Sequence, residues 1–338
     1  MKHIGIDLGT TETRIFLGGK GVVLTEPTAV AVNDETGEVL SVGFEASRLS
    51  GRTPDNVSVR YPVRSGVVVE FDAAAAMMEL FLHKSVRGIF SSHPKAIVAV
   101  PYSINDVEKR AVEEVVLEAG AKSVALIESS LASAIGAGMR VTNPRGSMIV
   151  DIGGGTTEIA VMSLGAIAVA RSIRVGGDTF DEAIVALAKR KYNVAISDAT
   201  AEYAKRSVGY VGKASDNPNP GRDMELQGKN IITGLPVKIR MSGEDMAEAM
   251  AEPMAKLLDG LRGVLAETPP EFASDLLEDG IVLSGGSARL GGLASLISRA
   301  THCKVTVAKN PTECSVLGLG RLLEYTGDVD RIIRFRSK

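Results

Sequence analysis

The sequence predicts an α/β fold made of two similar halves, each with a mostly parallel sheet flanked by helices. Two segments indicate the duplication. Residues 5–14, GIDLGTTETR, combine an apolar strand, an aspartate, a Gly/Thr turn and a second strand, and residues 148–161, MIVDIGGGTTEIAV, repeat that order. A third observation indicates the parallel sheet, because apolar strands alternate with helical segments between residues 96 and 136, as in βαβ units.

The first hairpin has the features of a phosphate-binding turn. Asp7 ends its first strand, and Gly9, Thr10 and Thr11 form the turn that leads into the second. Gly9 lets the backbone turn without a Cβ clash, and the N–H groups of such a turn can face inward and hold an anion. Asp7 is placed to hold a hydrated Mg²⁺ beside that anion.

The second hairpin repeats these features in the other half of the chain. Asp151 ends its first strand, and the turn that follows consists of Gly153, Gly154, Gly155 and Thr156. One hairpin of this kind is a weak signal, whereas two copies with an aspartate in the same place are a strong one. We therefore expect the two turns to clamp a triphosphate, with Asp7 and Asp151 facing each other across Mg²⁺.

Other phosphate-binding motifs are missing from the sequence. It contains neither a GxxxxGK[ST] P-loop nor a GxGxxG fingerprint, so phosphate binding depends on the paired hairpins. No lysine is required, because Mg²⁺ and backbone N–H groups carry the positive potential. A helix is expected to start just after Gly176 and Gly177, and its N-terminus is a further candidate site for phosphate. Residues 284–287 form a third glycine turn.

Composition sets the class of the protein. A chain of 338 residues predicts two domains. Hydrophobic residues make up 45% and charged residues 23%, with a net charge of −3, so no nucleic-acid partner is indicated. Cys303 and Cys314 are the two cysteines, and without a signal peptide they indicate a reduced, cytoplasmic setting. We interpret both as buried filler.

The remaining elements of the first half follow from local patterns. Residues 22–32 are predicted to form a third strand, and residues 33–64 a small inserted subdomain. Asp72 is expected to cap one helix, and a capping box at residues 103–106 another, whose apolar face begins at Val107. Strands are predicted over residues 96–100 and 124–127, and a helix from Ser129 or Ser130.

The second half is dominated by one long helix. Ser242 and Asp245 form a capping box at its start. Its methionine-rich face is interpreted as core rather than as a partner groove. Before it we expect a helix over residues 199–209 and two strands around Thr233. After it we expect strands over residues 281–283 and 305–307 and a last helix from Cys314.

These motifs resemble the MreB family of bacterial actins, in the actin/heat-shock-chaperone/sugar-kinase ATPase superfamily. The likeness covers nearly the whole chain. It is carried by IDLGT at residues 6–10, RYPVRSGVV at 60–68, LIESSLASAIGAG at 126–138, SMIVDIGGGTTEIAV at 147–161, RVGGDTFDEAI at 174–184, ETPPE at 267–271 and LSGGSARLGGL at 283–293.

The resemblance implies an actin-like, ribonuclease-H-like fold of four subdomains around a central cleft that binds ATP and Mg²⁺. Subdomain IA would comprise residues 1–32, 65–145 and 310–338, and subdomain IB residues 33–64. Subdomain IIA would comprise residues 146–180 and 245–309, and subdomain IIB residues 181–244.

The resemblance also implies roles for individual residues. The two turns would hold phosphates, with Gly176 and Gly177 nearby, and the adenosine would lie against Gly285, Gly286 and Ser287. Glu202, Lys205 and Arg206 match a helix that touches ribose and adenine in relatives. The alternative for these three is a solvated helix face.

Two departures from the family pattern concern hydrolysis. Relatives have a second acid where this chain has Ser129, and that acid positions the water that attacks the γ-phosphate. The catalytic residues would therefore be Glu128, Ser129 and the Mg²⁺ aspartate Asp151. Glu128 is adjacent to Ser129, yet neighbouring residues do not share a direction, so slow ATP hydrolysis is expected. The other departure is Glu12, which replaces an Asn and would repel phosphate unless it points away or pairs with a cation. Together they indicate a divergent paralogue or a variant with slow turnover.

Partners are also implied by the resemblance. We expect head-to-tail protofilaments, paired with one another, that act in cell-shape control at the inner face of the cell membrane with morphogenetic membrane proteins. Ile89 and Phe90 match a membrane-inserting loop, with burial inside the domain as the alternative. The chain starts directly at its first strand, so no N-terminal amphipathic helix is expected, and the basic tail at residues 331–338 is either an anionic-surface contact or a solvated end.

Two other functions are compatible with parts of the pattern. One is a nucleotide-sensing adaptor that binds ATP, hydrolyses little and recruits partners without long polymers. The other is a small-molecule kinase, which would need a base for its hydroxyl acceptor, and the sequence offers no candidate for one.

Overall fold

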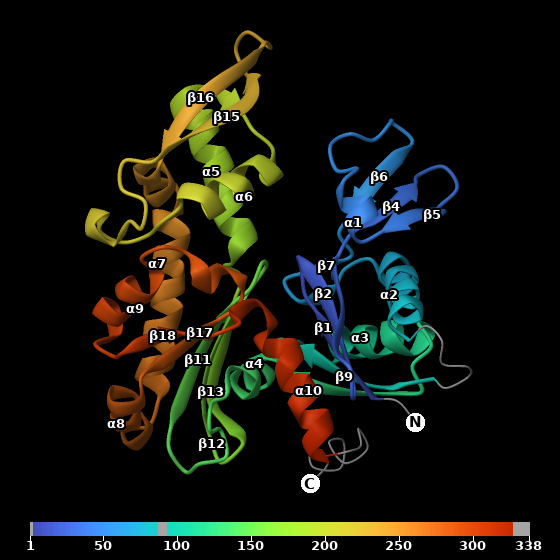
Figure 1. The fold of residues 1–338 in the computed structure, drawn as a ribbon, viewed down its shortest axis with the longest axis vertical. Coiled ribbons are helices and arrows are strands. Elements are labelled where there is room, and N and C mark those ends of the chain that lie inside the picture. Colours follow the sequence, from blue (N-terminus) through green and yellow to red (C-terminus); the bar gives the residue numbers. More distant parts are fainter. Residues whose placement is uncertain (1–2, 87–92, 327–338) are drawn as a thin grey trace. The chain divides into compact units, whose positions relative to one another are not determined.

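The computed structural model describes residues 3–86 and 93–326. The chain divides into two compact units, Met1–Val141 with Thr312–Lys338, and Thr142–Pro311 (Figure 1).

The first unit is built on a five-stranded sheet. Its strands, in sheet order, are β10 (Ser123–Glu128), β9 (Lys95–Val100), β1 (His3–Leu8), β2 (Glu12–Leu17) and β3 (Gly21–Pro27). β1, β2 and β3 form an antiparallel meander, whereas β9 and β10 run parallel to β1. The long connections needed between parallel strands are helices, as expected for βαβ units.

Helices cover both faces of this sheet. The core on one face joins the strands to α2 (Phe71–Ser85) and α3 (Asp106–Glu118). The core on the other face joins them to α4 (Ser129–Ala137) and α10 (Cys314–Thr326). α4 and α10 approach backbone to backbone, because a Cβ on Gly136 would lie 1.7 Å from the Cys314 carbonyl oxygen.

Two smaller sheets complete the first unit. One has the order β5 (Val39–Val42), β4 (Val30–Asn33), β6 (Val57–Arg60) and carries the short helix α1 (Phe44–Ser47). The other is the hairpin of β7 (Val63–Arg64) and β8 (Val67–Val68). This separate small sheet spans residues 30–60, and the expected subdomain at residues 33–64 stays a prediction.

Three local expectations for the first unit are wrong. Residues 22–32 are not one strand, because the chain leaves the main sheet after Pro27 and re-enters another sheet at Val30. α2 begins at Phe71, so Asp72 lies inside its first turn instead of capping it. The capping box of α3 uses Asn105 and Glu108.

The buried face of α3 differs from the expected one. Val107 is 78% exposed, while Val112, Val115 and Val116 lie in the core. The three buried valines follow the i, i+3, i+4 spacing of one helix face, and Val107 lies outside that face.

The second unit repeats the sheet of the first. Its strands, in sheet order, are β13 (Ala166–Ile173), β12 (Thr157–Ser163), β11 (Ser147–Ile152), β17 (Ile281–Ser284) and β18 (Val305–Val307). β11 is antiparallel to β12 and parallel to β17, which in turn is parallel to β18. The meander β11–β12–β13 therefore corresponds to β1–β2–β3, and β17 and β18 to β9 and β10. β18 is an edge strand with Val307 partly exposed.

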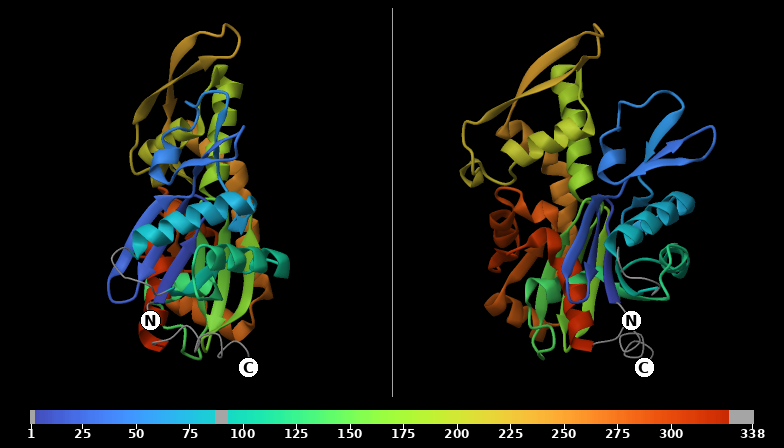
Figure 2. Two further views of the ribbon diagram at one scale, coloured as in Figure 1. Left: turned by 90° about the vertical axis from the view of Figure 1, so that its right-hand side faces the viewer. Right: turned by 45° about the vertical axis from the view of Figure 1, so that its right-hand side comes forward.

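The helices of the second unit surround this sheet and extend beyond it. They are α5 (Gly177–Tyr192), α6 (Asp198–Val208), α7 (Gly243–Glu267), α8 (Pro270–Asp279) and α9 (Leu293–Thr301), with short turns η1 (Ala214–Asp216), η2 (Gly286–Arg289) and η3 (Pro311–Glu313). A second sheet, β14 (Val194–Ala195), β15 (Asp223–Asn230) and β16 (Pro236–Ser242), projects from one end of the unit (Figures 1 and 2).

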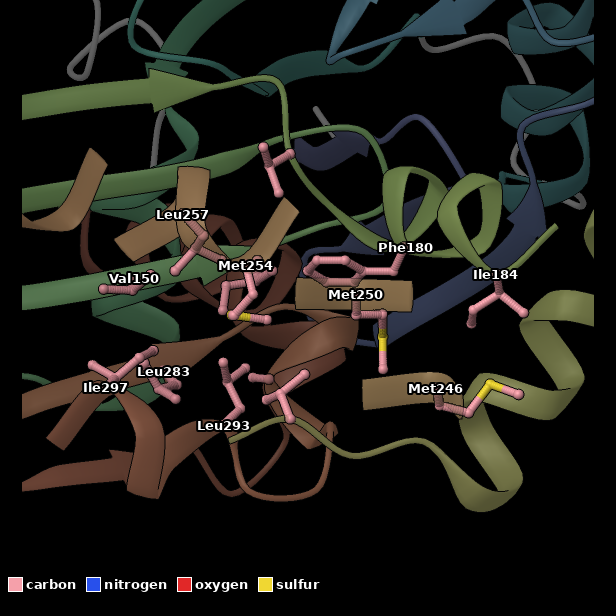
Figure 3. Packing of buried hydrophobic residues seen from close by; sticks show 14 of the residues in the cluster. Val150, Phe180, Ile184, Met246, Met250, Met254, Leu257, Leu283, Leu293 and Ile297 are labelled. Carbon is pink, nitrogen blue, oxygen red and sulfur yellow. The ribbon is translucent and has the colours of Figure 1, made fainter. Parts of the chain in front are cut away.

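The methionine-rich face of α7 is core, as predicted. Met246, Met250 and Met254 are buried and pack with Leu257 against Phe180 and the sheet (Figure 3). The capping box of Ser242 and Asp245 is present. Both cysteines are buried, which agrees with their interpretation as filler.

Candidate functional site

The turn of the first hairpin is held from the side by two other segments. β1 and β2 pair with Leu8 opposite Thr13, so the turn is residues 9–12. The Thr28 hydroxyl donates to the Gly9 carbonyl over 2.7 Å, and the Thr28 N–H donates to the Thr11 carbonyl over 3.0 Å. These two bonds explain why the chain leaves the main sheet between β3 and β4.

Glycine is required at the first position of this turn. A Cβ on Gly9 would lie 2.6 Å from the Glu12 carbonyl oxygen, closer than any side chain can approach. The Thr10 hydroxyl accepts a hydrogen bond from the Gly66 N–H over 3.1 Å. The turn is thus fixed by contacts with residues far away in the sequence, which is the pre-organisation that an anion-binding turn needs.

Three charged side chains lie on one face of the sheet beside this turn. Asp7 stands directly opposite Arg14 in the β1–β2 pair, and Glu12 is two residues before Arg14 on the same strand. Arg14 forms an ion pair with Glu12 and lies 3.9 Å from Asp7. Burial raises the pKa of Asp7 above its usual value, and the charge of Arg14 opposes that effect.

Arg14 was not among the residues predicted for the site. Glu12 was expected to repel phosphate unless it points away or pairs with a cation, and Arg14 is that cation. The alternation of side chains along a strand supplies the signal, because residues 12 and 14 of one strand share a face.

The turn of the second hairpin has the same length and the same register. Ile152 stands opposite Thr157 and Asp151 opposite Glu158, so the turn is residues 153–156. The Gly153 N–H donates to the Thr156 carbonyl over 2.9 Å. The next residue, Thr157, is fully buried and donates to the Val175 carbonyl over 2.7 Å, and its counterpart Thr13 is likewise buried.

The start of α5 braces the second turn. The Gly177 N–H donates to the Gly153 carbonyl and the Asp178 N–H to the Gly154 carbonyl, each over 2.9 Å. A Cβ on Gly176 would lie 2.4 Å from the Gly154 oxygen, so glycine is needed for this approach. The first amides of α5 therefore hold the turn, and direct phosphate contact by Gly176 and Gly177 stays a prediction.

The third glycine turn packs against the same hairpin. Gly285 has φ +83°, and a Cβ there would lie 2.2 Å from the Ile152 oxygen and 2.7 Å from Asp151 Oδ1. The Ser287 hydroxyl donates to the Gly153 carbonyl over 3.3 Å. Within the second unit, the structure thus places two further segments predicted to bind nucleotide, residues 176–177 and 285–287, against the turn at residues 153–156.

Lys205 connects α6 to this cluster. Its ammonium group donates to the Gly177 carbonyl and to Asp181 Oδ2, each over 2.8 Å, and its side chain is only 11% exposed. Arg206 is 71% exposed and pairs with Glu202 on the same helix, as expected for a solvated helix face. Contacts of these three residues with ribose or adenine stay predictions.

Glu128 and Ser129 lie at the junction of β10 and α4 in the first unit. Glu128 ends β10 and precedes the first helical residue, which is Ser129. Both residues are partly buried. Position 129 does not hold the expected acid. The chain changes from strand to helix between Glu128 and Ser129.

The residue types around the turns fit a polyphosphate with a hydrated Mg²⁺. Ser284 is fully buried, and its hydroxyl has no hydrogen-bond partner among the described residues; it pairs with Asp151 across β17 and β11. No group of three or more His, Cys, Asp or Glu side chains that could hold a metal occurs among residues 3–86 and 93–326. Mg²⁺ is usually held by one or two carboxylates, substrate phosphates and water. Asp7 and Asp151 belong to different units, so their pairing across Mg²⁺ stays a prediction.

Two expectations about membranes lie outside the described residues. They are the loop with Ile89 and Phe90 and the tail at residues 331–338. None of the described helices combines the length and the apolar character that a bilayer-spanning helix needs.

The pair of Asp181 and Lys205 generates a prediction about pH. Burial raises the pKa of Asp181 to about 6, and the Lys205 charge limits that rise. Since the pKa in the folded state exceeds the unfolded value, the contribution of Asp181 to stability is full at acidic pH and is lost as the pH rises through about 6. Lys205→Met should raise this pKa further, as measured by carboxyl ¹³C NMR titration of aspartate-labelled protein.

A matched control is Lys191→Met. Lys191 forms an ion pair with Asp245 in the same unit, and its loss should leave the titration of Asp181 unchanged. A titration of Asp181 near pH 4 in the natural protein, or no change with Lys205→Met, would contradict the assignment.

Comparisons with known proteins agree with this architecture. The sequence pattern of the family described as MreB/Mbl protein matches residues 1–331. The chain is 40% identical over 331 residues to the cell shape-determining protein Mbl of Bacillus cereus, covering 98% of this chain and 97% of the relative. It is 40% identical over 329 residues to the cell shape-determining protein MreB of Escherichia coli K12, covering 95% of this chain and 93% of the relative.

Solved structures show the same likeness. MreB5 of Spiroplasma citri bound to AMPPNP superimposes with a TM-score of 0.90 and 30% identity over 98% of each chain. The MamK double helical filament shares the fold with a TM-score of 0.80 and 22% identity, over 96% of this chain and 98% of MamK. The predicted duplicated actin-like α/β fold is therefore confirmed. By sequence pattern, identity and structure alike, the chain belongs to the MreB/Mbl family of actin-like proteins.

Proposed function

We propose that this chain binds ATP with Mg²⁺ and assembles into membrane-associated filaments that act in cell-shape control. The observation that carries the proposal is the pair of hairpins, one in each unit, with equal turn length and equal register. Support comes from MreB5 structures bound to AMPPNP and to ADP, at 30% identity to this chain, and from relatives named for cell-shape determination.

The residues would divide the work of nucleotide binding. N–H groups of the turns at residues 9–12 and 153–156 would hold the phosphates, and Asp7 and Asp151 would hold Mg²⁺ through its water shell. When bound, Mg²⁺ would supply positive charge that neutralises the phosphate oxygens. Gly285, Gly286 and Ser287 would lie against the adenosine, while Gly176, Gly177 and Lys205 hold the second turn in shape.

Head-to-tail contact between copies is the mode of assembly that we propose. Such a contact joins two different surfaces of the same chain, and it produces an open filament when the rotation between neighbouring copies does not close a ring. The filament found for MamK, which shares the fold, agrees with this mode. The alternative is an adaptor that binds nucleotide and recruits partners without long polymers.

Sedimentation separates the filament from the adaptor. The purified protein should pellet with Mg-ATP and remain in solution when EDTA removes the metal. Gly9→Ala should abolish pelleting, because the new Cβ meets the Glu12 carbonyl at 2.6 Å and deforms the turn. The matched control Gly18→Ala should pellet normally, since its Cβ meets nothing closer than 3.3 Å. Binding of a fluorescent ATP analogue without pelleting would favour the adaptor.

Slow hydrolysis is proposed because Ser129 occupies the place of the expected acid. A serine hydroxyl can orient water, but it is not a useful base near neutral pH. Ser129→Glu should raise the rate of phosphate release from Mg-ATP about 10-fold or more, with the roughly 10²–10⁴-fold typical of a well-positioned acid or base as the upper limit. Ser129→Gln has a similar shape without the charge and should not. If the natural protein already matches the Ser129→Glu variant, another group positions the water.

Membrane association is proposed through Ile89 and Phe90. Two neighbouring apolar residues bind a bilayer weakly, but a filament repeats the contact many times. Assembled protein should float with vesicles that contain anionic lipid, and the double variant Ile89→Ser, Phe90→Ser should stay at the bottom of the gradient. The control Leu164→Ser removes an exposed leucine elsewhere and should float. Equal flotation of all three proteins would place the contact in another segment.

A further inference from the structure

We infer that Glu12 and Arg14 act as one charge-compensating pair that sets the affinity of the first turn for polyphosphate. In this pair Arg14 neutralises Glu12 and lends positive charge to the turn beside Asp7. The inference rests on the nucleotide site proposed above and assigns a binding role to two residues that the hairpin pattern itself does not include.

The geometry places Arg14 between two carboxylates. Its guanidinium forms an ion pair with Glu12 and lies 3.9 Å from Asp7 Oδ2, and its side chain is 12% exposed. The side chain of Asp7 is 18% exposed and that of Glu12 35%. A guanidinium that is so little exposed keeps its charge, and with little solvent to screen it, that charge acts on whatever occupies the turn.

The second hairpin provides an internal comparison. Equal turn length and register make Arg14 equivalent to Glu158, and Glu12 equivalent to Thr156. The backbone of the hairpin therefore forms without an arginine at this position. Glu158 is buried and accepts a hydrogen bond from the Ser172 hydroxyl.

The comparison also shows what is particular to the first turn. Residues 153–156 contain no charged side chain, whereas the turn at residues 9–12 contains Glu12. Arg14 thus accompanies an extra carboxylate that would otherwise repel an anion bound to the turn N–H groups. This explains the presence of a buried cation where the hairpin fold does not require one.

The pair predicts an order of affinities for ATP. Arg14→Leu leaves Glu12 uncompensated and should weaken binding about 10-fold or more. Glu12→Asn frees the guanidinium for phosphate and should tighten binding several-fold. The double variant Glu12→Asn, Arg14→Leu removes both charges and should return to within about 3-fold of the natural protein, because coupled charges give non-additive effects.

Magnesium distinguishes a charge effect from structural damage. The affinity for a fluorescent ATP analogue is measured on the full chain, once with saturating Mg²⁺ and once with EDTA. Because Mg²⁺ supplies positive charge at the same place, the loss caused by Arg14→Leu should be larger in EDTA than in Mg²⁺. A deformed turn would lose affinity equally in both.

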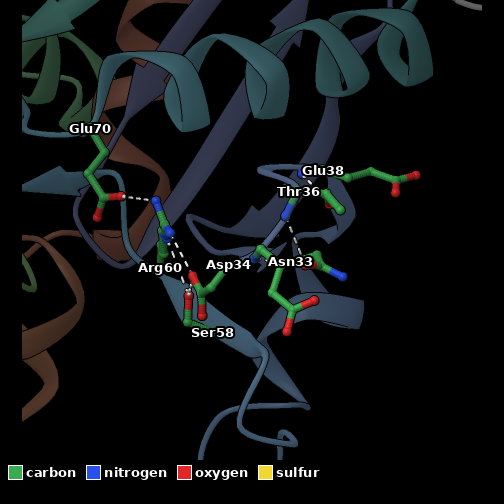
Figure 4. Close-up of polar contacts among 8 residues, drawn as sticks. Asn33, Asp34, Thr36, Glu38, Ser58, Arg60 and Glu70 are labelled. Carbon is green, nitrogen blue, oxygen red and sulfur yellow. Dashed lines mark hydrogen bonds and ion pairs between the residues drawn. The ribbon is translucent and has the colours of Figure 1, made fainter.

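The matched control is Arg60→Leu. Arg60 also lies between two carboxylates of the first unit, 2.6 Å from Asp34 and 3.4 Å from Glu70, as Figure 4 shows. Removal of Arg60 likewise leaves two carboxylates without their arginine, but these carboxylates lie outside the hairpin. The affinity for the ATP analogue should therefore be unchanged, both in Mg²⁺ and in EDTA.

The results separate this inference from the proposed function. If the natural protein binds no nucleotide, the proposed function fails. If the natural protein binds and Arg14→Leu binds equally well, or if the double variant is as weak as Arg14→Leu, the proposed function stands and the charge-compensating pair is overturned.

Discussion

The close approach of the backbone to itself in two hairpin turns is the constraint on which the site depends. In the first turn, a Cβ at position 9 would lie 2.6 Å from the carbonyl oxygen of position 12, whereas in the second a Cβ at position 153 would lie 3.3 Å from that of position 156. Glycine is therefore required at position 9, and the tight but less extreme approach at position 153 only favours it. Because both turns start one residue beyond the same cross-strand pair, each unit brings an aspartate to the same place beside its turn.

The two turns are fixed by different means. In the first unit, Thr28 bonds to the turn through its hydroxyl and its N–H. In the second unit, the first amides of α5 bond to the carbonyls of residues 153 and 154, and Lys205 fixes the start of α5 in turn. Both arrangements occupy turn carbonyls with intramolecular donors. The duplication has thus kept the geometry of the turn while the supporting contacts have diverged.

The charges beside the turns have diverged as well. The position opposite the strand-end aspartate holds Arg14 in one unit and Glu158 in the other. A buried side chain of either sign needs a partner, and each has one, Glu12 for the arginine and Ser172 for the glutamate. The two hairpins therefore offer similar backbones in unlike electrostatic surroundings, so equal roles in binding do not follow from equal shape.

The sequence by itself determined the duplication, the two hairpins, the alternation of strands and helices, and the capping box of α7. These features depend on residues a few positions apart, where strand and helix periodicity fix which side chains share a face. Only the tertiary structure decided that residues 22–32 divide between two sheets, that α5 braces a turn, and that Lys205 reaches Gly177. The bonds of α5 to the turn join residues 24 positions apart, and Lys205 lies 28 positions from Gly177, so packing of the whole unit selects these contacts from many alternatives that local patterns allow.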